Sequence, residues 1–234
     1  MKINIILSFI FCILIFHFTA KAQSAQSPWN IGIHITGNAG KMLWAGENVN
    51  NPNFSLTFPQ TVFRLGYGMG FSASYSVSNR FYIPLSFDII NRKFAIATGG
   101  VAMALDEDFQ LIPIDADHID YKINQASLAL GIGFKLFEKI GLEVLPYYQI
   151  AISDQKLKIG KVIDWRKSDF FKQSHDYGIS GNLKFILDSF YLKLGYQYGL
   201  KAIEEYSAFD ANALPLGKFQ IKNTMGLVSL GYTL

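Results

Sequence analysis

The sequence predicts an all-β protein, an eight-stranded antiparallel transmembrane up-and-down β-barrel with a cleaved signal peptide. Three observations support this prediction. The chain opens with a secretory signal, its remaining length alternates between apolar and small or polar residues, and the connections between the alternating segments are short and long by turns. Each of these features is typical of exported barrels that cross a membrane with strands.

The first 22 residues have the order of a secretory signal. Lys2 precedes an apolar run from Ile5 to Phe18, and Ala20-Lys21-Ala22 supplies the small residues of a cleavage site. The run is shorter than the roughly 20 residues that a spanning helix needs. We therefore expect residues 1–22 to be the signal peptide and residues 23–234 to form the barrel domain.

Composition excludes several other classes of protein. Cys12 is the single cysteine and lies in the predicted signal, so no disulfide is expected in the mature chain. Of 21 Lys and Arg residues, Lys2 and Lys21 fall in the signal, which leaves 19 basic against 18 acidic residues. Nucleic acid is not an expected partner, because its binding needs a concentrated basic surface.

Alternation with period two identifies the strands. Between Phe63 and Val77 the odd positions are apolar, and the even positions, apart from Arg64, are glycine or serine. A helix would scatter the same apolar side chains around its axis. The same alternation marks eight segments in all: residues 31–35, 63–77, 81–89, 128–134, 140–152, 177–187, 190–198 and 228–234.

The connections predict the orientation of the barrel. Tight turns are expected near residues 78–80, 137–139 and 188–189, and long polar loops near 40–60, 93–118, 153–172 and 201–218. Outer-membrane barrels have short periplasmic turns and long extracellular loops. The four long segments are therefore expected outside the cell, with both termini in the periplasm.

A soluble lipocalin-like barrel is the structural alternative. Its apolar face would have to fit inside an eight-stranded ring, which has little room. Here the apolar face is bulky and the opposite face is mostly small, so the bulk is expected outside, in lipid. Pro84 and Pro146 interrupt predicted strands, where we expect bulges or irregular pairing.

Two segments change the phase of the alternation. Upstream of Leu128 and of Val228 the apolar positions become odd-numbered, as at Tyr121 and Ile221. A bulge, or strand ends that rise above the membrane, would explain the change.

The ends of the chain carry a family resemblance. Ala20-Lys21-Ala22-Gln23 closes the signal and Leu230-Gly231-Tyr232-Thr233-Leu234 closes the chain. With the four-loop pattern, these segments resemble small Gram-negative outer-membrane barrels of the OmpX and OmpA transmembrane type, and the broad outer-membrane β-barrel family that includes PorT-like proteins. The resemblance implies recognition by the barrel-assembly machinery, although Leu234 stands where those proteins usually end in Phe.

Four charged residues form the candidate site. Aligned at the tight turns, Lys135, Glu143, Lys184 and Lys193 fall on the inward face near the periplasmic end of four consecutive strands. One carboxylate among three ammonium groups in a narrow lumen predicts a hydrogen-bonded ion-pair network that plugs the barrel. A proton or ion path through the same residues is the functional alternative.

No catalytic or metal-binding motif is visible, and no cofactor is expected. A lipid-modifying barrel enzyme would need a nucleophile, a histidine and an acid at one membrane edge, and His34, Ser174 and His175 are the residues that such a reading would use. The basic third loop, with Lys156 and Lys158, could touch anionic lipopolysaccharide.

These observations favour an outer-membrane protein that presents four extracellular loops and has a non-enzymatic role in surface interaction or envelope assembly. The alternatives are a subunit of a PorT-like secretion or transport complex and a lipid-modifying enzyme. The expected partners are outer-membrane lipid and lipopolysaccharide, the barrel-assembly machinery, and proteins that bind the loops.

Overall fold

A computed structural model describes residues 27–46, 61–105, 111–159, 163–167, 175–209 and 215–234. The predicted signal peptide, residues 1–22, lies outside the described residues, and so does Ser174. Within the described residues, no helix is long and apolar enough to cross a membrane.

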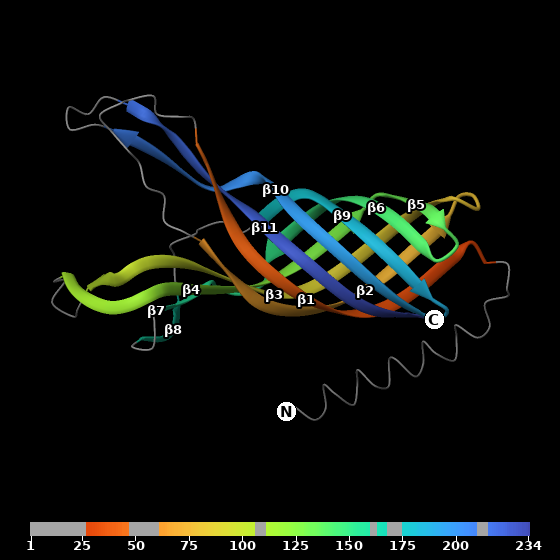
Figure 1. Cartoon of the computed structure of the whole chain (residues 1–234), viewed down its shortest axis with the longest axis horizontal. Helices are drawn as coiled ribbons and strands as arrows, with labels where there is room; N and C mark the ends of the chain where they lie inside the picture. Colours follow the sequence, from red (N-terminus) through yellow and green to blue (C-terminus); the bar gives the residue numbers. More distant parts are fainter. Residues whose placement is uncertain (1–26, 47–60, 106–110, 160–162, 168–174, 210–214) are drawn as a thin grey trace.

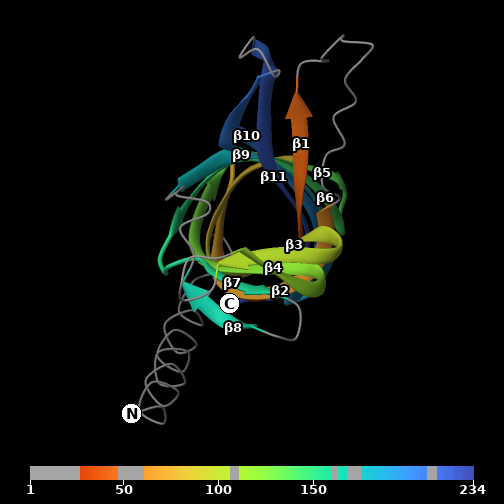
Figure 2. The same ribbon diagram turned by 90° about the vertical axis from the view of Figure 1, so that its left-hand side faces the viewer.

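The described chain forms one antiparallel sheet of eleven strands that closes into a ring (Figures 1 and 2). The strands are β1 (Trp29–Gly46), β2 (Thr61–Ser76), β3 (Phe81–Leu105), β4 (Leu111–Leu130), β5 (Ile132–Phe137), β6 (Ile140–Ala151), β7 (Lys156–Ile159), β8 (Ile163–Lys167), β9 (His175–Leu187), β10 (Phe190–Phe209) and β11 (Pro215–Thr233).

Eight ring positions result from these eleven strands. β4 and β5 share one position, because both pair with β3 and with β6. β6 and β7 share the next, because both pair with β4, and β8 pairs with β7 alone. β1 closes the ring against β11. The prediction of an eight-stranded antiparallel barrel is confirmed.

The apolar face points outward, as predicted. Along β6, exposed and buried side chains alternate. The exposed large apolar side chains include Phe71, Phe87, Leu142 and Val228, each of which leaves roughly half of its surface uncovered. Such a surface is favourable against hydrocarbon and unfavourable against water.

Aromatic pairs gather on neighbouring strands at the end of the barrel that carries the tight turns. Trp29 contacts Tyr75, and Phe190 contacts Tyr232, with ring centroids 5.0 and 5.1 Å apart. Each pair joins residues directly opposed in the ladder. Amphipathic rings at this level are typical of the interface between hydrocarbon and headgroups.

The predicted long loops need correction. β1 continues to Gly46 within the segment 40–60, and the segment 153–172 contains β7 and β8. Residues 93–118 and 201–218 are largely strand, because β3 and β4 continue to Leu105 and Leu111, and β10 and β11 to Phe209 and Pro215. The two hairpins project beyond the ring, on the side opposite the tight turns (Figure 1). Alternation was lost there because these segments leave the membrane, and a strand with water on both sides needs no apolar face.

The two prolines coincide with gaps in two ladders, that of β3 and that of β6 with β4 and β5, and neither ladder shifts its register there. Pro84 and Pro146 flank Gly131, the residue that separates β4 from β5. Proline cannot donate to a ladder, but the backbone oxygen of Pro84 still accepts from the N–H of Gly131 at 3.1 Å. The register on either side is unchanged, with Leu85 opposite Leu130 and Tyr82 opposite Gly133. The irregular pairing expected at the prolines is present, and the bulge is not.

The change of phase upstream of Leu128 and Val228 involves no bulge in β4 against β3 or in β11 against β1, although the ladder of β10 with β11 shifts register between Tyr198 and Glu204. β4 keeps one register against β3 from Ile119 to Leu130, and β11 keeps one register against β1. Tyr121 and Ile221 point into the barrel, where they form a buried apolar cluster with Met42 and Phe94. Each strand therefore keeps the same face toward the lumen along its length. What changes along the strand is whether that face carries polar or apolar residues.

A charge on the outward face should destabilise the barrel according to its depth. We expect Val144→Arg, near the middle of β6, to lower the free energy of unfolding in phosphatidylcholine vesicles by about 2–4 kcal/mol. Val77→Arg, beside a tight turn, should cost about 0–1 kcal/mol, because the charge there reaches water. Denaturant titration of both variants measures the difference, and equal costs would contradict the assignment of the outer face to lipid.

Candidate functional site

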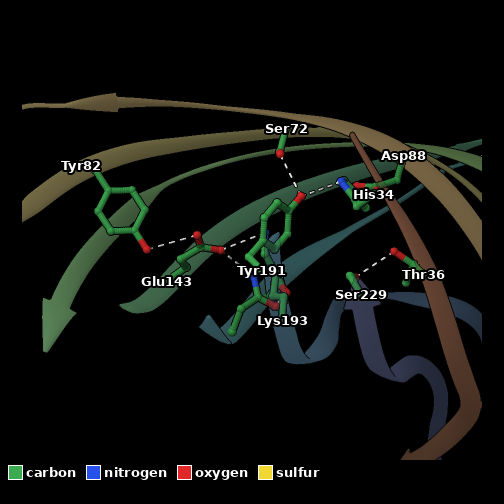
Figure 3. Close-up of polar contacts among 11 residues, drawn as sticks. His34, Thr36, Ser72, Tyr82, Asp88, Glu143, Tyr191, Lys193 and Ser229 are labelled. Carbon is green, nitrogen blue, oxygen red and sulfur yellow. Dashed lines mark hydrogen bonds and ion pairs between the residues drawn. The ribbon is translucent and has the colours of Figure 1, made fainter. Parts of the chain in front are cut away.

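The candidate site surrounds Glu143 in the half of the lumen nearest the tight turns (Figure 3). Its carboxylate, 1% exposed, forms an ion pair with Lys193 at 3.1 Å between Oε2 and Nζ. The Tyr82 hydroxyl donates to Oε1 at 3.2 Å, and the Asn182 amide donates to Oε2 at 3.5 Å. Both carboxylate oxygens therefore have partners, as a buried charge requires.

Strand register explains why these charges meet. Lys184 and Lys193 are direct partners between β9 and β10, and Lys184 is also opposite Gly141 of β6, whose other partner is Lys135. Glu143 lies one inward position above this row. Two directly opposed ammonium groups repel each other, so the nearby carboxylate compensates their charge.

The structure does not bring all four predicted residues together equally. Lys193 contacts Glu143, and Lys184 interacts with it electrostatically. Lys135 is separated from Lys184 by Gly141 and acts on Lys184 through its charge.

Two tyrosines that the sequence analysis did not single out fill the same part of the lumen. Tyr82 lies across Gly133 and Gly141, and Tyr191 lies across Gly231. A Cβ at Gly133 or Gly231 would collide with the ring, and one at Gly141 would collide with the Tyr82 hydroxyl. Lys184 Nζ is 4.5 Å from the centroid of the Tyr191 ring, a cation–π distance. Because glycine has no Cβ, these positions leave the space into which the inward aromatic rings fit.

Tyr191 connects the lysines to a second polar chain. Its hydroxyl lies 3.1 Å from Nδ1 of His34 and 3.0 Å from the Ser72 hydroxyl. Nε2 of His34 lies 2.5 Å from the Asp88 carboxylate. A neutral imidazole satisfies all of these contacts, because Nε2–H donates to Asp88 while Nδ1 accepts from Tyr191. Figure 3 shows the two sets of hydrogen-bonded side chains next to each other.

Further layers pack the lumen above this level. Gln149 donates to Gln197 at 3.1 Å. Asp176 accepts from Asn223 at 2.9 Å and from Tyr147 at 3.3 Å. Arg92 is 2% exposed and donates to the backbone oxygens of Lys41 and Thr224, and it attracts Asp176 electrostatically. Above them stands the apolar cluster of Met42, Phe94, Tyr121 and Ile221.

Two small cavities lie in the lower lumen. A cavity of about 20 Å³ borders Glu143, Lys184 and Tyr191, and one of about 30 Å³ borders His34 and Asp88. Each is large enough for one or two water molecules. The arrangement can order water and hold charge.

The histidines of the enzyme alternative are not brought together. His34 lies in the lumen with Tyr191 and Asp88. His175 is on β9 and contacts Lys201 at 2.6 Å and the ring of outward-facing Tyr148. Ser174 lies outside the described residues. In the described part of the chain, no group of three or more His, Cys, Asp or Glu side chains could hold a metal ion.

Comparisons with known proteins found similar solved structures and no matching family. No protein-family model matches the chain, and no curated protein matches it. Among solved structures it is similar to Ail, the attachment invasion locus protein of Yersinia pestis, with 13% identity, a TM-score of 0.43, and coverage of 88% of this chain and 99% of Ail.

Two further outer-membrane structures are similar. Neisserial surface protein A is 9% identical with a TM-score of 0.45, over 86% of this chain and 96% of that protein. OprG, an outer-membrane protein of Pseudomonas aeruginosa, is 12% identical with a TM-score of 0.37, over 89% of this chain and 97% of OprG. The closed ring, packed lumen and apolar exterior described above define the class of this chain: a membrane-spanning eight-stranded β-barrel.

Removal of the buried carboxylate should destabilise the barrel strongly. We expect Glu143→Ala to lower the free energy of unfolding in detergent by about 3–5 kcal/mol, because Lys193 is left buried without its counter-charge. The control Glu138→Ala, in an exposed tight turn, should change it by less than about 0.5 kcal/mol. The double variant Glu143→Ala/Lys193→Met should recover part of the loss, since it removes both charges. Equal effects of the two Glu variants would contradict a stabilising role for the network.

Proposed function

We propose that this chain is an exported outer-membrane barrel with a non-enzymatic role, exerted through its extracellular hairpins and loops in surface interaction or envelope assembly. The observation that carries the proposal is the contrast between the two parts of the molecule. The ring is packed internally by side chains, and the strands on one side continue past it as long hairpins.

The orientation of the barrel in this proposal rests on the position of the tight turns. β1 begins, and β11 ends, on the side of the tight turns, where the backbone N–H of Leu234 donates to Ile31. In barrels of this kind the short turns face the periplasm. The β3–β4 and β10–β11 hairpins then face outward from the cell.

A general diffusion pore fits this lumen poorly, because eight strands enclose only enough space for side chains. We expect the purified protein to give no stable conductance in planar bilayers. Large, persistent conductance steps would show that the lumen opens, and they would overturn the proposal.

The first test of function is co-purification from native outer membranes. An affinity tag between Phe209 and Pro215, at the tip of the β10–β11 hairpin, leaves the ring untouched. We expect surface-exposed or envelope proteins to be recovered in substoichiometric amounts. Recovery of a fixed set of proteins in stoichiometric ratio would favour a PorT-like secretion or transport subunit instead.

The enzyme alternative has its own measurement. Mass spectrometry of lipid A from cells with and without the protein should give identical acyl-chain patterns. The gain or loss of an acyl chain would replace the non-enzymatic proposal with the lipid-modifying one.

A further inference from the structure

More positive than negative charge borders the cavity of about 20 Å³ in the lower lumen. Lys184 of β9 and Lys193 of β10 line it, and so does Glu143 of β6. Glu143 is already paired, because Lys193 and the Tyr82 hydroxyl contact its two carboxylate oxygens. Lys184 lies against the face of the Tyr191 ring, 4.5 Å from its centroid, and the ring carries no net charge that could balance the ammonium group.

The surrounding part of the lumen has the same surplus of positive charge. Its charged side chains in the described part of the chain are Lys135, Lys184, Lys193, Glu143 and Asp88. Three ammonium groups thus face two carboxylates, and His34, which contacts Asp88, is neutral in the hydrogen bonds described above. A surplus charge inside so narrow a ring is unfavourable unless a counter-charge lies close to it.

Hydroxyl groups form the wall across the ring from the two lysines. Ser72 and Ser74 of β2 and Ser86 of β3 line the same cavity, and Ser72 is directly opposite Ser86 in the ladder. The Tyr191 hydroxyl reaches Ser72 across the lumen at 3.0 Å, so the two walls meet at this level (Figure 3). The side chains of Ser74 and Ser86 make no hydrogen bond to another described residue, and their hydroxyls can donate into the cavity.

The size and position of the cavity limit its ligand. A volume of about 20 Å³ fits one water molecule or one ion of similar size, and it is too small for a polyatomic anion such as sulfate. Asn30 and Thr233 line the cavity at the end that carries the tight turns, and Asn30 is exposed, so an ion enters from that end. A water molecule would fill the same volume but would leave the surplus charge in place.

We propose that this cavity binds a small monovalent anion, with chloride as the representative ligand. Lys184 supplies the positive charge, and the hydroxyls of Ser74 and Ser86 donate from the opposite wall. Glu143 does not exclude the anion, because Lys193 neutralises its carboxylate. A spherical halide accepts hydrogen bonds from any direction, which suits ammonium and hydroxyl donors that converge from two walls. The ion is held at one place in the lumen, and no continuous path through the barrel is required.

The first test is thermal unfolding of the detergent-solubilised barrel in sodium chloride. Sodium gluconate, whose anion is too large for the cavity, keeps the ionic strength constant. A ligand that binds only the folded state stabilises it by mass action, so the melting temperature should rise along a one-site saturation curve. At about 100 times Kd the folding equilibrium shifts about a hundredfold, and the melting temperature of a chain of this length rises by about 5–10 °C. A melting temperature that is indifferent to the exchange of gluconate for chloride would overturn the proposal.

Two variants locate the effect. Lys184→Met should abolish the chloride dependence, because it removes the surplus charge and keeps a side chain of similar length. The matched control Lys139→Met removes an exposed ammonium group from the β5–β6 tight turn and should respond like the native chain. A chloride response that persists in Lys184→Met, or that Lys139→Met loses as well, would contradict a site at Lys184.

The serine wall has its own variant. Ser74→Ala/Ser86→Ala keeps the charges but removes two donors, and it should weaken chloride binding by about tenfold or more, since hydrogen bonds to a charged group are lost. Unchanged affinity would mean that the anion does not lie between the two walls.

Crystallography gives an answer even if Lys184→Met does not fold. Crystals of the native barrel soaked in sodium bromide should show an anomalous peak in the cavity, within hydrogen-bond distance of Lys184 Nζ. Absence of bromide from this position would overturn the proposal. The measurement does not depend on the orientation of the barrel or on hairpin partners, so its failure would leave the proposed surface role unaffected.

Discussion

Closure of the sheet is the constraint on which the rest of the molecule depends. β1 and β11 pair from Gly32 opposite Thr233 to Gly46 opposite Phe219 without a shift in register. In hydrocarbon an open strand edge would leave backbone donors and acceptors without partners, and each would cost several kcal/mol. The seam between the first and last strands satisfies these groups, and only then is an apolar exterior favourable.

A ring of eight strands also fixes what its interior can contain. There is room for side chains and little else, so the inward aromatic rings of Tyr82 and Tyr191 require glycines opposite them. The same narrowness keeps water from the buried charges, which must then find partners in the wall. The contacts around Glu143, Tyr191 and His34 join six of the eight ring positions. They hold together strands that are not neighbours.

Much of the fold could be read from the sequence, because period two reports which face a side chain occupies. Parity also places Tyr82 and Tyr191 inside, since their neighbours Phe81 and Phe190 are outward. The sequence analysis passed over them because it looked for charges.

Contacts across the lumen could not be predicted from the sequence. Parity gives the face and the tight turns give the height, but the stagger of the closed ring decides which side chains meet across it. The pairing of Tyr191 with His34, 157 residues apart, is of this kind. The apparent change of phase at Tyr121 was misread for a related reason: apolar was taken to mean outward along the whole strand. Above the hydrocarbon the outer face must be polar, and the inner face is free to be apolar.

This inversion of the two faces also sets how deep the barrel sits. It occurs at one level on several strands, with Tyr121 inside and Lys122 outside on β4, and Ile221 inside and Lys222 outside on β11. A displacement of one residue pair toward the periplasm, about 5 Å, would carry several ammonium groups toward hydrocarbon at once. A tilt would immerse one side of the ring and lift the other. The level of this inversion on the strands thus sets one preferred immersion depth and holds the barrel axis close to the bilayer normal.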